Sequence, residues 1–204
     1  MAADDKLKEY RAKRDLRKTP EPSGGDRKRG EKPIFVIQKH DARNLHYDFR
    51  LEVDGALASW AVPKGPSTDP GDKRLAIHVE DHPLDYASFE GVIPEGMYGA
   101  GAVLVWDQGT YRNLMEEKDD PLPMHESIEA GHVEVWLEGE KLKGGFALVK
   151  MKGREDNQWL LVKMKDKEAD ARRNPVSTQP NSVLSGASLD EIREHLKEEE
   201  KGSS

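Results

Sequence analysis

The stretch from His40 to Gly55 reads HDARNLHYDFRLEVDG. Apolar and polar residues alternate from Leu45 to Val53, which is typical of a β-strand whose successive side chains point to opposite sides. One side is apolar and suits a hydrophobic core. The other side carries His46, Asp48, Arg50 and Glu52. A purely structural strand rarely places an imidazole, a carboxylate and a guanidinium in succession, so the pattern predicts a side that binds a ligand.

The preceding residues predict a partner strand. Residues 34–40 (IFVIQKH) are rich in β-branched and aromatic side chains, and residues 41–44 form a turn that would close a hairpin. His46 and Asp48, two apart on one strand, lie roughly 7 Å apart at Cβ level and can converge on one ion, with His40 arriving from the partner strand. Two imidazoles and one carboxylate suit Mn²⁺, Fe²⁺ or Zn²⁺ and leave coordination positions open. Asp41 competes as a ligand but sits in the turn.

A second set of residues is cationic. Arg50, Lys64 and Arg74 each lie on a predicted strand or strand end, and such side chains bind phosphate oxygens. His82, in DHPLDY, is a candidate general acid, phosphate ligand or third metal ligand, with Tyr86 four residues further on. A metal beside convergent cations indicates phosphoryl chemistry, because both neutralise charge on phosphate oxygens.

The residues alone leave two alternatives open. Fe(II) oxygenases also use two histidines and a carboxylate. In those enzymes the second histidine would come from a distant strand, whereas here His40 is already adjacent, which counts against an oxygenase. A non-catalytic module that grips DNA ends would bind without turnover.

Short strands separated by turns, with hardly any helix, predict a mainly all-β fold. We expect a β-barrel or sandwich of about eight strands with short helices and irregular charged termini. The expected strands are residues 34–40, 45–53, 56–63, 74–79, 102–106, 110–113, 132–139, 144–152 and 158–165, with a turn at 107–109. Residues 6–18 suit a short helix, and residues 188–199 carry a capping box formed by Ser188 and Glu191.

Composition divides the 204 residues into three parts: a charged, largely irregular arm (1–32), a barrel domain (33–168) and a polar linker with a short helix (169–204). The arm holds eleven Lys or Arg and seven Asp or Glu, whereas residues 81–165 hold nine and sixteen. A basic arm suits phosphate contacts even though the net charge is −7, but a solubilising tail is the commoner meaning of such a charge balance.

The absence of cysteine excludes disulfides and Cys-ligated zinc and fits a reducing compartment. No apolar run is long enough to cross a membrane, and residues 1–15 lack the apolar centre of a signal peptide. We therefore expect a soluble, cytoplasmic protein.

Five blocks resemble the 3′-phosphoesterase module of bacterial DNA ligase D and its stand-alone relatives. The blocks are RDLRKTPEPSG, FVIQKHDARNLHYDFRLEVDG, WAVPKGPS, VEDHPLDYASFEGVIPEGMYGAG and QWLLVKMKD, and they span about Tyr10 to Lys167. The resemblance implies a small β-barrel with a Mn²⁺-dependent site, with Co²⁺ or Zn²⁺ as other candidate metals. It implies action on the 3′ ends of DNA or DNA–RNA primer-templates in double-strand break repair by non-homologous end joining. It also implies ligase and polymerase modules as partners, in the same chain or apart, and we expect a monomer.

The resemblance implies two steps. A phosphodiesterase step removes a terminal 3′ ribonucleoside and leaves a 3′-phosphate, and a phosphomonoesterase step then gives a 3′-OH. By motif, the implied metal ligands are His40, His46 and Asp48. The implied residues around the phosphate are Arg50, Lys64, Arg74, His82 and Tyr86. The resemblance adds Arg14, Asp15 and Glu21, and it links them chiefly to the ribonucleoside-removing step. The arm is therefore expected to contribute to the active site, where composition reads it only as solvated charge.

Overall fold

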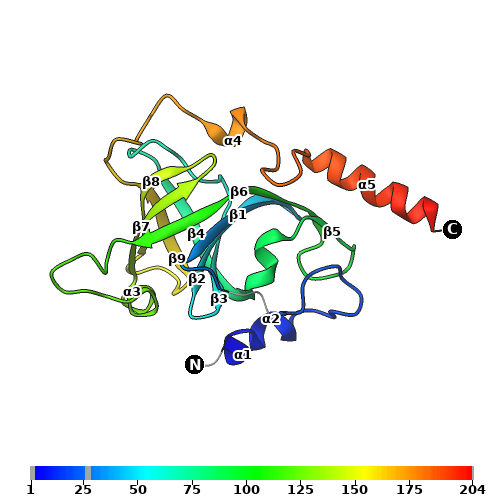
Figure 1. The fold of residues 1–204 in the computed structure, drawn as a ribbon, viewed down its shortest axis with the longest axis horizontal. Coiled ribbons are helices and arrows are strands. Elements are labelled where there is room, and N and C mark those ends of the chain that lie inside the picture. The colour runs from blue at the N-terminus through cyan, green and yellow to red at the C-terminus, as the bar shows by residue number, and fades with distance from the viewer. Residues whose placement is uncertain (1–2, 26–28, 204) are drawn as a thin grey trace.

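The computed structural model describes residues 3–25 and 29–203. Eight antiparallel strands form a closed barrel in the order β1-β2-β3-β4-β9-β8-β7-β6, with β6 pairing back onto β1 (Figure 1). The barrel strands are β1 (Ile34–Asp41), β2 (Leu45–Val53), β3 (Ala56–Val62), β4 (Lys73–Pro83), β6 (Gly101–Asn113), β7 (His132–Gly139), β8 (Lys143–Lys150) and β9 (Gln158–Lys163). A ninth strand, β5 (Gly91–Ile93), pairs only with the first part of β6. The expected barrel of about eight strands is confirmed.

The helices are short, except at the carboxyl end. They are α1 (Ala3–Lys6), α2 (Lys8–Ala12), the 3₁₀ helix η1 (Leu84–Ser88), α3 (Met124–Ala130), α4 (Pro175–Thr178) and α5 (Leu189–Gly202). The helix expected over residues 6–18 is confirmed only for Lys8–Ala12 (α2), because α1 lies before this range except for Lys6. The capping box is confirmed, because the Ser188 hydroxyl accepts a hydrogen bond of 3.2 Å from the Glu191 amide. Residues 26–28 of the expected arm lie outside the described residues.

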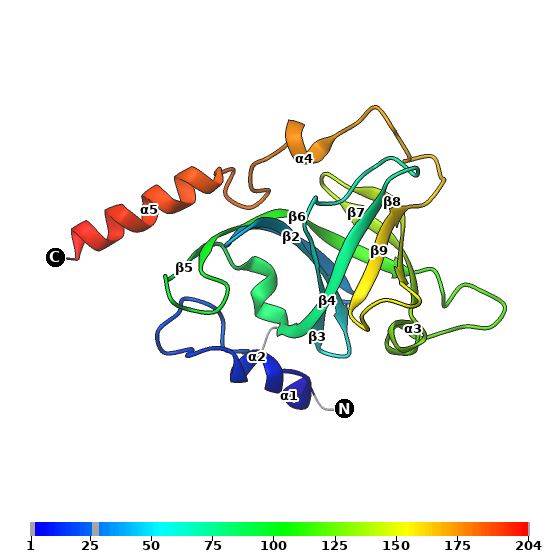
Figure 2. The same cartoon turned by 180° about the vertical axis from the view of Figure 1, so that it is seen from behind.

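Alternation along β1 and β2 separates two apolar clusters. Phe35, Ile37, Tyr47 and Phe49 belong to the larger cluster, which also contains Trp106 of β6 and Trp159 of β9 and fills the barrel interior. Val36 belongs to a smaller cluster that includes residues of α2, η1 and β5. These elements cover the outer wall of the barrel, and Figure 2 shows η1 between the barrel strands and α2. The polar side of β2 therefore lies on this outer wall, because its apolar side faces the barrel interior.

Tyr10 fastens the amino-terminal arm to the outer wall. Its side chain is fully buried in the smaller cluster, and its hydroxyl donates a hydrogen bond of 2.6 Å to the Pro22 carbonyl. The ring contacts the rings of His82 and Tyr86 edge to face. The described part of the arm thus has little regular structure but packs against the barrel, as burial of a whole aromatic side chain requires.

The structure corrects three local expectations. The turn expected at 107–109 does not exist, because β6 runs unbroken from Gly101 to Asn113. Asp107 instead turns its carboxylate to the turn between β7 and β8, where it accepts hydrogen bonds of 2.9–3.0 Å from the amides of residues 140–142. His82 lies on β4, which extends to Pro83 and not only to residue 79 as expected. Residues 91–93, which lie in none of the expected strands, form β5.

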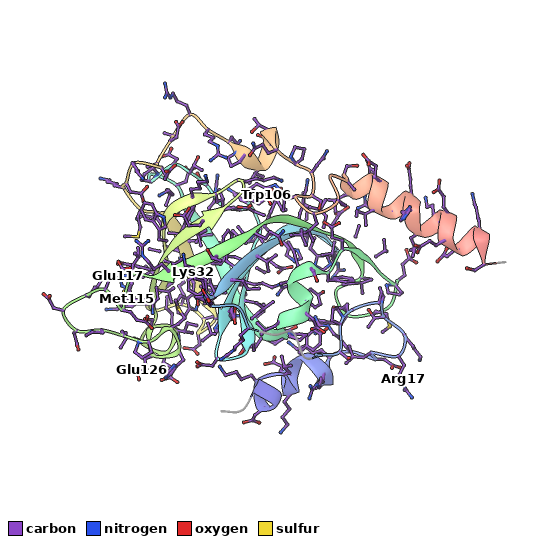
Figure 3. All side chains as sticks on the ribbon, in the orientation of Figure 1. Arg17, Lys32, Trp106, Met115, Glu117 and Glu126 are labelled. Carbon is purple, nitrogen blue, oxygen red and sulfur yellow. The ribbon has the colours of Figure 1, made fainter. Side chains whose placement is uncertain are left out.

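The polar segment after the barrel is fastened to it by backbone acceptors. The Trp106 indole N–H and the Lys141 ammonium both donate to the Gln179 carbonyl, at 2.8 and 2.9 Å. Figure 3 shows Trp106 at the end of the barrel next to this segment. Further along, Arg193 of α5 forms an ion pair with Asp41 at the end of β1. Within the described part of the chain, no helix combines the length and apolarity that crossing a bilayer demands.

Asp107 provides a test of the β7–β8 turn. Replacing Asp107 with Ala leaves three amides of the turn without their acceptor, and buried unsatisfied groups are costly. We expect the free energy of unfolding to fall by about 3 kcal/mol, measured by urea denaturation. Asp119→Ala, at an exposed position, is the matched control and should change it by less than about 0.5 kcal/mol. Equal stability of the two variants would contradict the assigned role of Asp107.

Candidate active site

The hairpin of β1 and β2 brings the predicted metal ligands together. His40 lies directly opposite His46 in the antiparallel register, and Gln38 lies opposite Asp48. Side chains opposite each other in such a pair share one face and have Cβ atoms about 5 Å apart. The register therefore places both imidazoles and the carboxylate on the outer wall of the barrel.

Backbone carbonyls fix the tautomers of both histidines. His40 Nε2 lies 2.6 Å from the Gly99 carbonyl oxygen, and His46 Nδ1 lies 3.0 Å from that of Asn44. A carbonyl oxygen only accepts, so these two nitrogens carry the protons. The lone pairs of His40 Nδ1 and His46 Nε2 are left facing Asp48 Oδ2, at 3.5 and 3.3 Å. Second-shell hydrogen bonds of this kind orient the imidazoles of metal sites.

This donor set fits a divalent metal ion. The three donor atoms lie within 4.8 Å of one another. Two lone pairs that converge on a carboxylate oxygen repel it unless a cation lies between them. Burial acts to raise the pKa of Asp48, but the charge of Arg50 and the contacts with His40 and His46 together outweigh it and hold that pKa well below the usual range, so the carboxylate is ionised. Nitrogen and oxygen donors in this ratio suit Mn²⁺, Zn²⁺ or Fe²⁺.

Arg50 is held beside the donor set by three side chains. Its Nη2 lies 3.5 Å from Asp48 Oδ2. Its Nε donates to Gln38 Oε1 at 2.7 Å, and its Nη1 donates to the Ser59 hydroxyl at 2.9 Å. Gln38 in turn donates to the carbonyls of Tyr86 and Phe89, which ties β1 to η1. Arg50 is thus a buried, fixed cation, and its position is set before any ligand binds.

A second cation comes from the arm. Arg14 donates through Nε to Glu21 Oε2 at 2.9 Å and through Nη1 to Glu80 Oε1 at 3.3 Å. Its guanidinium carbon lies 4.1 Å from the ring centroid of Tyr10. Glu21 also accepts a hydrogen bond of 2.8 Å from the Tyr86 hydroxyl. Arg14 is therefore held by one carboxylate and one aromatic ring of the arm and by one carboxylate of β4.

His82 is a neutral imidazole in this arrangement. Its Nδ1 donates to the Glu80 carbonyl at 2.9 Å, so its Nε2 carries the lone pair. Nε2 lies 3.3 Å from Arg14 Nη2, which can only donate. Burial, together with the charges of Arg50 and Arg14, holds the pKa of His82 well below its usual value. Burial and the Glu21 carboxylate raise the pKa of Tyr86, so its hydroxyl keeps its proton.

These groups line one cavity of about 290 Å³. Its walls are formed by Arg14, His40, Ala42, His46, Asp48, Arg50, Ala61, Val79, Glu80, His82, Tyr86, Ile93, Tyr98 and Gly99. A three-donor metal set and two fixed guanidinium groups thus share one cavity. Such a space suits an anion with several oxygens.

The comparison with known families agrees with this geometry. Residues 38–150 match the model of the DNA ligase D 3′-phosphoesterase domain. The chain belongs to this family. It is therefore a phosphoesterase domain, and its relatives are longer proteins that carry this domain as one part.

Three relatives show how much of them the phosphoesterase domain represents. A Pseudomonas aeruginosa protein named multifunctional non-homologous end joining protein LigD is 51% identical over 195 residues, which is 93% of this chain and 22% of the relative. The protein of the same name from Mycolicibacterium smegmatis is 47% identical over 169 residues, 80% of this chain and 21% of the relative. A Mycobacterium tuberculosis protein named multifunctional non-homologous end joining DNA repair protein LigD is 46% identical over 165 residues, which is 80% of this chain and 20% of the relative. The chain spans about a fifth of the length of the curated relatives it matches.

Not every residue expected at the phosphoesterase site lines the cavity. Lys64 is exposed in the turn after β3, and Arg74 pairs with Asp72 at 3.4 Å. Asp15 pairs with Arg17 at 3.1 Å, and Figure 3 shows Arg17 pointing away from the barrel. The structure thus gathers Arg14, Glu21, Arg50, His82, Tyr86 and the metal ligands, and it places the other three outside the cavity wall. Their roles stay predictions.

Sequence reasoning missed several residues that shape the site. Gln38 lies two residues before His40 on the same face of β1, so alternation could have found it. Ser59 lies opposite Arg50 in the pairing of β2 with β3. Glu80 lies two residues before His82 on β4 and was missed because the expected strand ended at residue 79.

The donor set predicts the effect of removing one ligand. Asp48→Asn removes the only anionic donor, so we expect Mn²⁺ affinity to fall at least about a hundredfold by isothermal titration calorimetry. Asp54→Asn is the matched control, because Asp54 lies in the β2–β3 turn at a φ of +48° that asparagine tolerates. It should bind Mn²⁺ as the unchanged protein does. Tight Mn²⁺ binding by the Asp48 variant would contradict the assignment of the metal site to this donor set.

Proposed function

We propose that the chain is a Mn²⁺-dependent 3′-end-processing phosphoesterase. Its phosphodiesterase step removes a 3′-terminal ribonucleoside and leaves a 3′-phosphate, and its phosphomonoesterase step converts that end to a 3′-OH. The observation that carries the proposal is the single cavity in which His40, His46 and Asp48 face Arg14 and Arg50. Co²⁺ and Zn²⁺ are alternative metals for the same donors.

The proposed setting is double-strand break repair by non-homologous end joining. The names of the relatives support it, because they describe multifunctional end-joining proteins. We propose that the chain acts as a monomer on the 3′ end of DNA or of a DNA–RNA primer-template. Ligase and polymerase modules would use the 3′-OH that it produces, in the same chain or apart.

The arginines would bind the phosphate oxygens. A divalent ion held by His40, His46 and Asp48 would supply a Lewis acid for one of these oxygens. Arg50 and Arg14 are already fixed by side chains of β1, β3 and the arm, so they stabilise developing negative charge without reorganisation. A guanidinium also offers paired donors that match two oxygens of one phosphate.

His82 is suited to hold Arg14 in place. In the free protein its Nε2 lone pair points to Arg14, and its low pKa keeps it neutral at pH 7. An imidazole in this state has no proton on Nε2 to donate, and its low pKa also makes it a weak base, which favours the role of a positioning group. We propose that it holds Arg14 against the phosphate.

Lys64, Arg74 and Asp15 do not line the cavity. We propose that they act on parts of the nucleic acid beyond the scissile phosphate. An Fe(II) oxygenase would use a similar donor set, but the family assignment identifies a phosphoesterase domain.

The test uses a primer-template whose primer is labelled at the 5′ end and carries one 3′-terminal ribonucleotide. With Mn²⁺ we expect conversion first to a shortened primer with a 3′-phosphate and then to one with a 3′-OH, resolved by gel electrophoresis. Asp48→Asn is the control and should give neither product. Binding without any product would instead identify an end-binding module.

Arg14 and Arg17 form a matched pair for the role of the arm. Arg14 contacts His82 and Glu80 within the site, whereas the Arg17 side chain is 89% exposed. We expect Arg14→Ala to reduce the phosphodiesterase rate on the order of a hundredfold, and the phosphomonoesterase rate by less. Arg17→Ala should leave both rates unchanged. Equal losses of the two activities in Arg14→Ala would refute a selective role for the arm.

A further inference from the structure

Tyr98 is an exposed aromatic residue at the active-site cavity. The large hydrophobic side chains exposed in the described residues are Leu45, Leu75, Tyr98, Val149 and Leu184, and of these Tyr98 alone lines the cavity. It is 47% exposed. Its hydroxyl has no hydrogen-bond partner among the described residues. Packing therefore does not account for an aromatic ring at this place.

The loop between β5 and β6 fixes the backbone of Tyr98. The Met97 amide donates to the Pro94 carbonyl at 3.2 Å, and the Ala100 amide donates to the Met97 carbonyl at 3.1 Å. The next residue, Gly99, has a φ of +76° and accepts the hydrogen bond from His40 Nε2. Tyr98 is thus bonded directly to the residue that orients a metal ligand, and its distance from the metal donors is set by rigid backbone.

The arm meets the ring from the other side. The Lys13 ammonium lies 5.3 Å from the Tyr98 ring centroid, and the Arg14 guanidinium carbon lies 5.1 Å from it. Lys13 is held by Glu9 and Glu80, at 2.9 and 3.1 Å. An exposed ring next to two cations is the combination that single-stranded nucleic-acid sites use, in which bases stack on aromatic rings and cations follow the backbone.

We propose that Tyr98 stacks on the nucleobase at the 3′ end of the bound strand. The proposal rests on the proposed function and adds a specificity-determining residue to it. When the phosphate is held by the metal donors and arginines, the attached sugar follows, and the base must lie toward the open side of the cavity. Tyr98 is the exposed residue of the cavity lining, so it lies where the cavity meets solvent. Every base has a π-face, so the site would accept any 3′-terminal base and discriminate against an end that has lost its base.

A purely structural role makes a different prediction. If Tyr98 only holds Arg14 in place, its loss harms every substrate equally. If it stacks on the base, its loss matters only for ends that carry a base.

The first experiment crosses two substrates with three proteins. One primer-template ends in a normal ribonucleoside, and the other ends in an abasic ribose. We expect kcat/KM of the unchanged protein to be on the order of tenfold lower for the abasic end. For Tyr98→Ala, kcat/KM should fall by the same factor on the normal end and should not change on the abasic end. For Tyr98→Phe, kcat/KM should equal that of the unchanged protein on both ends. Equal losses by Tyr98→Ala on both ends, or no loss on either, would overturn stacking.

The second experiment needs no turnover. A duplex with a recessed 3′ end terminates in a 2-aminopurine ribonucleoside that is joined to the strand through a 5′-methylenephosphonate, whose carbon–phosphorus bond resists hydrolysis. Stacking quenches 2-aminopurine fluorescence, so quenching is expected with the unchanged protein and Tyr98→Phe but not with Tyr98→Ala. If this quenching pattern is observed but the first experiment gives no product, Tyr98 stacks on the base and the proposed reaction is rejected. Absence of quenching by the unchanged protein would reject the stacking.

Discussion

The site depends on the buried carboxylate of Asp48. This group is 5% exposed and ionised, with Arg50 on one side and two imidazole lone pairs on the other. A buried charge is costly unless other charges and hydrogen bonds compensate it. Arg50 supplies part of that compensation and is itself held by Gln38 and Ser59. Gln38 continues the network to η1, so the position of one carboxylate determines the arrangement of strands and helix around it.

The location of the site follows from the packing of the barrel. The interior of the barrel is filled by the larger apolar cluster and has no room for a ligand. The chemical groups of β1 and β2 therefore lie on the outer wall, where water would otherwise screen them. The arm and η1 cover that wall, and Arg14, Glu21 and Tyr86 belong to this cover. The cover thus excludes water and supplies a cation at the same time, which explains why a segment with little regular structure is packed so closely.

Local patterns in the sequence predicted the hairpin, its polar side and the three donors, because alternation and register are properties of neighbouring residues. The continuous strand β6 was not predicted, since Asp107 and Gly109 are typical of turns. In the structure, Asp107 accepts hydrogen bonds from the amides of residues 140 and 141. Gly109 is a glycine because a Cβ at this position would collide with the Glu138 carbonyl of the neighbouring strand. The role of Arg14 came from family resemblance alone, because its partners Glu80 and His82 are distant in sequence. Lys64 and Arg74 illustrate the opposite problem, since closeness in sequence suggested a cluster that the cavity wall does not include.

Strand β2 carries two tasks on one backbone. Tyr47, Phe49 and Leu51 pack inside the barrel, whereas His46, Asp48 and Arg50 form the site outside. Substitutions at one set of positions can therefore accumulate over evolution with little effect on the other set, so stability and chemistry can drift separately. The same arrangement makes the strand intolerant of length changes. Deleting a single residue between Leu45 and Val53 would exchange the two sides, burying the charges and exposing the apolar side chains in one step.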